Sequence, residues 1–461
     1  MTVKGGIPLQ HRLWSTLVQN VILPVGDRLY GQQMMQRLSL LRKAQWWSSE
    51  RIEEYRTASF LQLIHVAYSE VPFYRHLMDR SGLTPQDLAR PEDLRKLPIV
   101  SKDMLRAGYP DQTTRPTGQT TYEACSSGST GAPFCVREDS STAGWYRAAF
   151  LLALEWAGWP IGVPHVQTGM TLSRPRGRRL KDLLLRCHYV SAYDLTDGHL
   201  DAVLDHMERH SIQFLWGYPG SLFFLAQRAI RRGWNRSLRA VATWGDNLYA
   251  HYRTAIETAF SCHVFDQYGI GEGVMIAAQC GQGCHYHQFD TDVILEFVDD
   301  DEQPVSSGEV GHILATRLHP GPMPLIRYRV GDIGIPGSEG ACACGRAFRI
   351  METIQGRDTD IITTPSGNRL IVHFFTGILE YYPEIDTFQV VQEEPDSIVL
   401  RLVPRGMLED NLIRKVVSQL KDRGADLNIR VEVVSEIPLP PNGKRRFVIS
   451  RLGNATSRST V

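Results

Sequence analysis

Apolar side chains recur at helical spacing in the first quarter of the chain. Between residues 53 and 69 they return every three or four positions, and this period predicts an amphipathic helix. Prolines at 72, 85 and 98 then interrupt the pattern, because the residue before a proline is disfavoured in the helical conformation. Residues 40 to 110 are therefore predicted to be mostly helical, with several short elements after the first long one.

The pattern changes between about residue 120 and residue 350. Short apolar runs, such as 264–268 and 293–298, alternate there with stretches of helical period, such as 200–209 and 249–260. Alternation of strands and helices predicts a layered α/β architecture. We expect a large multi-layer N-terminal domain of β-sheets flanked by helices.

The composition shifts once more after Gly356. The last hundred residues predict a small α+β module, with strands at 387–392, 397–403 and 429–434, a helix at 407–423 and a turn at 438–443. A chain of 461 residues exceeds the size at which a single core keeps growing. We therefore predict two domains, residues 1–355 and residues 356–461.

Charge and hydropathy narrow the choice of partners. Fifty basic residues balance fifty acidic ones, so the bulk charge gives no reason to expect nucleic acid or an anionic membrane as the main partner. No run of about 18 apolar residues occurs, and no convincing secretory signal is found. A cytoplasmic enzyme acting on a small molecule is the expectation.

The first 45 residues carry an apolar segment that includes Trp14, Val21, Ile22 and Leu23. Packing on the same chain is the default for such a segment, and a partner protein or a membrane surface are the alternatives. The sequence does not reveal the oligomeric state.

A polar loop offers the first indication of chemistry. It combines hydroxyls with glycines in the order Ser126, Ser127, Gly128, Ser129, Thr130, Gly131. Glycine lets the main chain approach an anion, and hydroxyl and amide groups donate hydrogen bonds to phosphate oxygens. The lysine of a Walker A motif is absent. The loop therefore predicts polyphosphate binding, with a plain surface turn as the alternative.

Four further motifs follow this loop in a fixed order. They are Tyr268-Gly269-Ile270-Gly271-Glu272, Arg327-Tyr328-Arg329-Val330-Gly331-Asp332, Gly356-Arg357-Asp358-Thr359-Asp360 and Pro441-Asn442-Gly443-Lys444. Together they resemble the adenylate-forming superfamily of acyl- and aryl-CoA synthetases. Segments 71–75, 97–102 and 217–219 are similar to the branch of phenylacetate-CoA ligase and the capsular-polysaccharide-associated ligases. The resemblance covers residues 45 to 450 and implies a mobile C-terminal domain.

The resemblance implies a role for each motif residue. Lys444 would bridge the substrate carboxylate and the α-phosphate of ATP, since two anions must meet in the reaction. Glu272 would bind Mg²⁺, a hard cation that prefers oxygen ligands, although Gly271 stands where the family usually has threonine. A solvated lysine and a glutamate at a helix N-terminus are the plain alternatives.

The same resemblance assigns the adenosine pocket. Asp332 would accept hydrogen bonds from the ribose hydroxyls, and Arg357 would follow it onto the sugar-phosphate. Tyr268 and Gly269 would lie near the adenine, with Gly245 and Asp246 completing the purine pocket. Turn residues and ion-pair partners are the alternative roles.

Eight cysteines are scattered along the chain, without the dense spacing of a disulfide framework. Two clusters nevertheless combine soft thiolates with imidazoles, as tetrahedral zinc requires. The proposed ligands are Cys280, His287, Cys342 and Cys344, with Cys284 and His285 in reserve. Some members of the branch carry zinc at this position, and four ligands would make the site structural. Unliganded, reduced cysteines are the alternative.

The predicted activity is ATP- and Mg²⁺-dependent adenylation of an aryl or acyl carboxylic acid, with release of pyrophosphate. The acyl group then passes to a thiol, with coenzyme A as the expected acceptor by resemblance. Amide or ester formation in polysaccharide or natural-product biosynthesis is one alternative. A nucleotide-binding relative without turnover is another, and the joint presence of Glu272, Asp332, Arg357 and Lys444 argues against it. The sequence does not reveal the acid.

Overall fold

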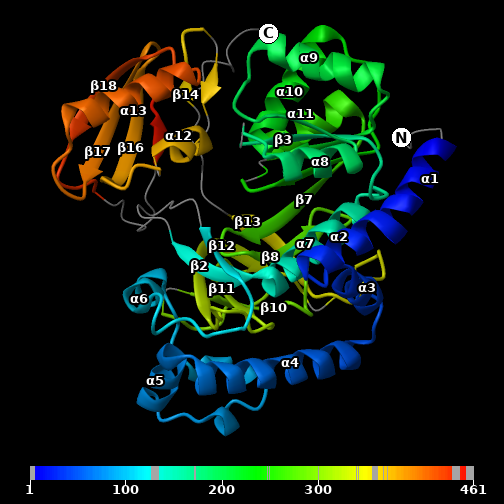
Figure 1. Cartoon of the computed structure of the whole chain (residues 1–461), viewed down its shortest axis with the longest axis vertical. Coiled ribbons are helices and arrows are strands. Elements are labelled where there is room, and N and C mark those ends of the chain that lie inside the picture. The colour runs from blue at the N-terminus through cyan, green and yellow to red at the C-terminus, as the bar shows by residue number, and fades with distance from the viewer. Residues whose placement is uncertain are drawn as a thin grey trace.

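A computed structural model describes most of the chain. The described residues are 6–125, 134–170, 173–246, 248, 250–299, 301–338, 340, 342–355, 362–366, 368–370, 372–379, 381–438 and 447–452. Figure 1 shows helices surrounding central sheets, with the C-terminal strands and helices gathered in a separate group. This arrangement confirms the predicted α/β class with a small α+β part.

The N-terminal segment is helical, which confirms the prediction for residues 40–110 and extends it toward the N-terminus. Its elements are α1 (Leu9–Leu17), the π-helical turn η1 (Val18–Ile22), α2 (Leu23–Tyr30), α3 (Met34–Ala44), α4 (Ser49–Glu70), α5 (Pro72–Arg80), the 3₁₀ turns η2 (Pro85–Asp87) and η3 (Pro91–Lys96), and α6 (Lys102–Gly108). Helix α4 begins where the Ser48 side chain accepts a hydrogen bond from the amide of Arg51, which is a normal N-cap. Prolines open α5, η2 and η3, where a missing amide hydrogen costs nothing.

Eleven strands form the main sheet, in the order β10-β11-β12-β13-β9-β8-β7-β6-β5-β3-β4. Their bounds are β3 (His165–Gly169), β4 (Cys187–Ser191), β5 (Phe214–Gly217), β6 (Ala240–Trp244), β7 (His263–Ile270), β8 (Val274–Gln279), β9 (Tyr286–Gln288), β10 (Val293–Val298), β11 (Gly311–Arg317), β12 (Tyr328–Pro336) and β13 (Ile350–Gln355). Strands β3 to β7 pair in parallel, and the pairs from β7 to β10 are antiparallel. A separate hairpin joins β1 (Thr121–Cys125) to β2 (Cys135–Asp139).

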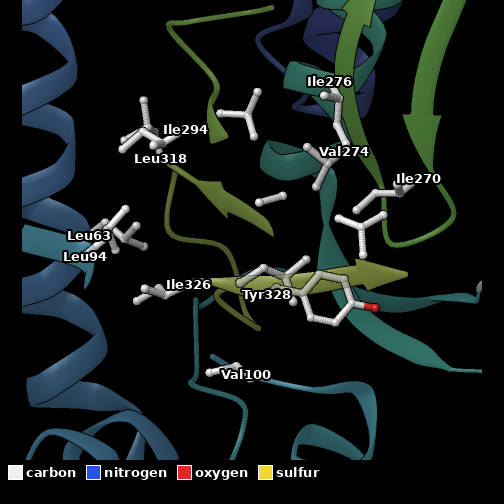
Figure 2. Packing of buried hydrophobic residues seen from close by; sticks show 14 of the residues in the cluster. Leu63, Leu94, Val100, Ile270, Val274, Ile276, Ile294, Leu318, Ile326 and Tyr328 are labelled. Atoms are coloured by element: carbon white, nitrogen blue, oxygen red, sulfur yellow. The ribbon is translucent and has the colours of Figure 1, made fainter. Parts of the chain in front are cut away.

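Helices cover both faces of the parallel strands. They are α7 (Ser140–Trp156), α8 (Arg176–Leu184), α9 (Asp197–Arg209), α10 (Pro219–Arg232) and α11 (Ala250–Phe260). In β5, Leu215 packs with α9, α10 and α11, whereas its neighbours Phe214 and Trp216 pack with α3 and α7. Alternation of this kind follows from the two-residue period of a strand. A third apolar cluster joins α4 to the antiparallel strands, and Figure 2 shows Leu63 and Leu94 on the side of Ile326.

The C-terminal part has its own sheet, ordered β18-β17-β16-β19. Its elements are β14 (Ile362–Thr363), β15 (Arg369–Leu370), α12 (Val372–Leu379), β16 (Ile385–Glu394), β17 (Ser397–Pro404), α13 (Asp410–Asp422), β18 (Asn428–Val433) and β19 (Val448–Ser450). Helix α13 begins three residues later than predicted, and Met407 is 94% exposed. Phe374 of α12 packs edge-on against Tyr193 of the larger part, with ring centroids 5.9 Å apart. The boundary between residues 355 and 356 adjoins the undescribed segment 356–361 and stays a prediction.

Two sequence expectations receive a direct answer. Among the described residues, no helix combines the length and apolar composition needed to cross a bilayer. Cys135 is disulfide-bonded, so disulfide bonding, which the scattered spacing made the weaker interpretation, does occur at this position. Cys135 lies opposite Cys125 in the register of the β1–β2 hairpin.

Candidate active site

The hydroxyl-rich loop lies between β1 and β2. Its residues 126–131 lie outside the described residues, as do Arg357 and Lys444. The two strands pair antiparallel up to Cys125 and Cys135, so the ends of the loop are adjacent. On β2, the buried Glu138 accepts a hydrogen bond from the Arg317 guanidinium at 2.5 Å. This ion pair fixes the hairpin against β11 of the main sheet.

The same hairpin touches the turn that carries Glu272. Gly273 has φ +78°, and a Cβ atom there would lie 3.2 Å from the Glu138 carboxyl carbon. Glycine is therefore needed twice, for the backbone conformation and for the close approach. The strand that follows the hydroxyl loop and the predicted Mg²⁺ ligand are thus held next to each other.

Glu272 is a buried carboxylate with two partners. The Tyr328 hydroxyl donates to its Oε1 at 2.6 Å, and the Lys102 ammonium lies 3.5 Å from the same oxygen. Only 2% of Glu272 is exposed. Burial of a charge is costly unless it is paired and hydrogen-bonded, and these two groups supply the pairing.

Lys102 reaches this position through a short strand-like contact. The Val100 amide donates to the carbonyl of Arg327 at 3.0 Å, and the Arg329 amide donates to the carbonyl of Val100 at 2.9 Å. The following Ser101 caps α6 through its side chain. Sequence reasoning used the motifs containing Lys102 and Tyr328 for the resemblance but gave neither residue a role. The presence of a lysine and a tyrosine in these two motifs was the only feature of the sequence that could have indicated a role for them.

Two residues predicted for the adenosine pocket are in contact. The Tyr268 hydroxyl donates to Oδ2 of Asp332 at 2.8 Å, although three strands separate β7 from β12 in the sheet. Gly269 allows close approach, since a Cβ atom there would lie 3.0 Å from the carbonyl oxygen of Val274. Asp332 is thereby held beside the turn that carries Glu272.

Gly245 and Asp246 form the turn after β6. Gly245 has φ +80°, and a Cβ atom there would lie 2.6 Å from Cε1 of Tyr218. Burial, together with nearby tyrosines and Asp246, raises the pKa of Tyr218. The turn that was predicted to complete the purine pocket therefore packs against the ring of Tyr218, the residue that precedes α10.

A small cavity of about 10 Å³ lies beside Gly273. Its lining residues are Thr142, Trp145, Tyr146, Gly273, Val274, Met275, Asp292, Arg317 and His319. Trp145 stacks on His319 with ring centroids 3.6 Å apart, and His319 Nε2 lies 3.2 Å from Oδ1 of Asp292. Aromatic walls with a few polar groups are typical of small-molecule sites.

The four proposed metal ligands converge elsewhere on the sheet. The ligand atoms of Cys280, His287, Cys342 and Cys344 all lie within 4.8 Å of one another. Cys280 and Cys342 have their sulfur atoms 3.6 Å apart, and Cys344 Sγ lies 3.4 Å from Nε2 of His287. Tetrahedral zinc, with bonds of about 2.0 to 2.3 Å, would separate its ligand atoms by about 3.3 to 3.8 Å.

The surroundings of His287 also fit a metal ligand. Its Nδ1 donates to the carbonyl of Phe348 at 3.2 Å, which leaves Nε2 facing the sulfur atoms. Burial lowers the pKa of His287 to about 4, so the ring is neutral. A second hydrogen bond that fixes the imidazole is usual at metal sites. Cys284 is exposed and stands outside the group, whereas His285 Nε2 lies 3.0 Å from Cys342 Sγ.

Comparisons with known proteins agree with this geometry. The family described as the CapK C-terminal domain matches residues 362–451. A phenylacetate-coenzyme A ligase of Thermus thermophilus is 23% identical over 87% of this chain and 96% of its own length. Protein CapK of Staphylococcus aureus is 21% identical over 95% of this chain and 97% of its own length.

A solved structure with a similar fold is 2-hydroxyisobutyryl-CoA ligase in complex with 2-HIB-AMP and CoA. It has a TM-score of 0.58 at 20% identity, over 89% of this chain and 91% of that one. The same ligase in its postadenylation state with 2-HIB-AMP also has a TM-score of 0.58, at 19% identity. With the ordered motifs and the sheet topology, these relationships support the resemblance: the chain is similar to AMP-forming ligases of the adenylate-forming superfamily, in the branch of the phenylacetate-CoA ligases and CapK.

Proposed function

We propose that this chain activates a small carboxylic acid with ATP and transfers the acyl group to a thiol, with coenzyme A as the first candidate. The observation that carries the proposal is the meeting of three sequence motifs at Glu272. This carboxylate is buried between Lys102 and Tyr328, and the next residue, Gly273, closely approaches Glu138 on the strand that leads out of the hydroxyl loop. A plain structural turn would not need a buried acid with both a cation and a hydroxyl.

The reaction has two steps. A carboxylate oxygen of the acid attacks the α-phosphorus of ATP, the bond to the pyrophosphate oxygen breaks, and pyrophosphate leaves. The sulfur of the acceptor thiolate then attacks the acyl carbon, and AMP leaves with the electrons of the carbon–oxygen bond. Mg²⁺, when bound, would neutralise phosphate charge, and Glu272 would hold it through an oxygen atom.

The charged residues of this chain would each contact a different part of the substrates. Lys102 would pair with Glu272 and lie close to the phosphates. Lys444, on the C-terminal part, would approach the carboxylate and α-phosphate in the first step and withdraw in the second, through a domain rotation near Asp358. Asp332, oriented by Tyr268, would accept hydrogen bonds from the ribose.

The cavity beside Gly273 is the proposed site of the acid. Its volume of about 10 Å³ is that of roughly one water molecule, so side chains would have to move to admit an acid. Tyr146 offers an exposed aromatic ring at this position. We propose an aryl or acyl acid, as the resemblance implies.

A second acceptor class is kept as an alternative. Transfer to an amine or hydroxyl, forming an amide or an ester, is the second step that the resemblance to the capsular-polysaccharide-associated ligases implies, and protein CapK matches 95% of the chain. The first step, acyl-AMP formation, would be the same.

The Cys/His cluster is proposed to hold a structural zinc ion. Cys280, His287, Cys342 and Cys344 supply four donors of the kinds that zinc prefers, and the Phe348 carbonyl fixes the imidazole. Four protein ligands leave no position for a reacting water. The ion would link the loop before β13 to the β8–β9 hairpin.

ATP–pyrophosphate exchange against a panel of aryl, short acyl, fatty and amino acids tests the proposal. We expect exchange with one aryl or short acyl class, and its loss by about 100-fold or more in Lys444→Ala. Coenzyme A, amines and sugars are then offered as acceptors to the purified enzyme with the active acid. Absence of exchange with every acid, despite tight ATP binding, would favour a nucleotide-binding relative without turnover.

A further inference from the structure

The N-terminal helix carries an apolar stripe that faces solvent. Elements α1, η1 and α2 form one continuous helical rod from Leu9 to Tyr30, which lies along the edge of the molecule in Figure 1. The apolar stripe occupies every fourth position: Leu9, Leu13, Leu17, Val21, Val25 and Leu29. These side chains are between 42% and 80% exposed. Nothing within the described part of the chain covers them.

The opposite side of the rod packs against the rest of the chain. Val18 is fully buried, and Trp14, Ile22 and Leu23 pack against the apolar cluster of α3 and α7. The default expectation, packing on the same chain, is therefore correct for one face only. A helix that is apolar on two faces requires a second apolar environment. The π-helical turn η1 has more residues per turn than an α-helix, which limits the drift of a four-residue repeat around the rod.

Positive charge accompanies the stripe. Arg12 and Arg28 on the rod are exposed. The only acidic residue between residues 6 and 33 is Asp27, and its carboxylate accepts hydrogen bonds from the amides of Met34 and Met35. The rod thus presents no free carboxylate.

Helix α8 adds a second basic and apolar element beside the rod. The Trp14 indole donates to the carbonyl of Leu184 at 3.0 Å, and the Arg186 guanidinium lies over the Trp14 ring. Residues 173–186 contain six basic residues and one acid, Asp182, which is paired with Arg174. Leu180 and Leu183 of α8 are 57% and 72% exposed.

We propose that the rod and α8 bind reversibly to the surface of an anionic lipid bilayer. Apolar side chains would enter the boundary between headgroups and acyl chains, and the surrounding arginines would contact lipid phosphates. The zero net charge of the whole chain does not oppose this, because the basic residues are concentrated locally. A second copy of the chain fits less well, since paired helices use flanking charges of opposite sign, and here the flanks are basic. The proposal stands independently of the proposed function.

Vesicle co-sedimentation of the full chain tests the surface. We expect the protein to pellet with vesicles of equal parts phosphatidylglycerol and phosphatidylcholine, and to do so far less with phosphatidylcholine alone or in high salt. The triple variant Leu9→Gln, Leu13→Gln, Leu29→Gln should bind about tenfold or more weakly. Met407→Gln, an exposed apolar residue elsewhere, is the matched control. Circular dichroism and the thermal midpoint verify that each variant is folded.

A second variant separates charge from apolar contact. Arg176→Gln, Arg178→Gln, Arg179→Gln should reduce binding to the anionic vesicles and remove most of its salt dependence. Equal pelleting with both lipid compositions, or no pelleting at all, would overturn the proposal even if every variant failed to fold. A dimer in light scattering that the leucine variant converts to monomer would assign the stripe to a second copy, and would overturn it as well.

Discussion

The two ends of strand β8 carry two different kinds of cluster. Glu272 and Gly273 lie in the turn before its first residue, Val274, and Cys280 follows its last residue, Gln279. The Cys/His cluster is complete in itself, because four donors face one another at distances that suit one ion. The Glu272 cluster differs, because the neighbouring Gly273 lines a small cavity and closely approaches Glu138 on the strand that leaves the hydroxyl loop. We propose that the first arrangement serves stability and the second serves substrate binding.

The largest effect is expected from breaking the Cys/His cluster. Cys342→Ser should remove the metal and lower the free energy of unfolding by several kcal/mol, about 5 or more, because a structural metal contributes directly to folding. Pyrophosphate exchange per folded molecule should change little at low temperature. Metal content by elemental analysis and the thermal midpoint measure the effect. Cys262→Ser, a free thiol outside the cluster, is the control, and equal loss in both variants would contradict the assignment.

The second largest effect is expected in the pH dependence of the free energy of unfolding, through Asp290. Asp290 follows β9 and accepts a hydrogen bond from the Arg349 amide at 2.5 Å, and burial raises its pKa to about 7. Below about pH 4 both folded and unfolded chains hold this proton. As the pH rises toward 7, the unfolded chain releases it and the folded chain does not, so this residue lowers stability by at most about 4 kcal/mol.

Asp290→Asn keeps the acceptor oxygen and removes the titration. We expect the thermal midpoint of the wild type to fall relative to the variant between about pH 4 and pH 7. Exchange activity at a fixed pH should be similar in the two proteins. Asp301→Asn, at an exposed position, is the control. A midpoint difference that is constant with pH, or that has the opposite sign, would show that Asp290 is ionised in the folded protein.

At the other end of β8, a substitution of Glu272 should reduce activity strongly and change stability little. Glu272→Gln should reduce pyrophosphate exchange by about 30- to 1,000-fold, on the order of 2 to 4 kcal/mol of transition-state stabilisation. Its thermal midpoint should stay unchanged or fall slightly, since Tyr328 and Lys102 keep an oxygen acceptor but the Lys102 ammonium loses its counter-charge. Glu302→Gln, more than half exposed and outside the site, is the matched control. Normal exchange in Glu272→Gln would remove this residue from the mechanism.

The smallest effect concerns the ribose contact. Tyr268→Phe removes the hydroxyl that donates to Asp332, and loss of one such hydrogen bond costs about 1 kcal/mol. We expect a several-fold higher KM for ATP with little change in kcat. Tyr122→Phe, on the exposed part of β1, controls for the substitution. An effect on the acid's KM instead would move Tyr268 from the nucleotide pocket to the acid pocket.

The sequence predicted the elements because their patterns are local. The helix at 53–69, the strands at 264–268 and 293–298, and the C-terminal strands follow from periodicity alone, and the structure confirms them within a few residues. Helix α13 begins later than predicted, because apolar content does not define a helix start without its cap. The two cysteine clusters were also visible, since thiols and imidazoles in short spacings are rare outside metal sites.

Which of these groups touch was decided only by tertiary structure. Spacing places Tyr268 and Asp332 far apart along the chain, and only the curvature and order of the sheet bring their side chains to 2.8 Å. Lys102 meets Glu272 because Val100 pairs with the backbone beside Tyr328. The exposed stripe on the N-terminal rod became evident only once its other face was seen to be buried. The sequence determines which chemical groups each residue carries. Whether two such groups interact depends on how distant segments pack, because contact energies act over a few ångströms in space and not along the chain.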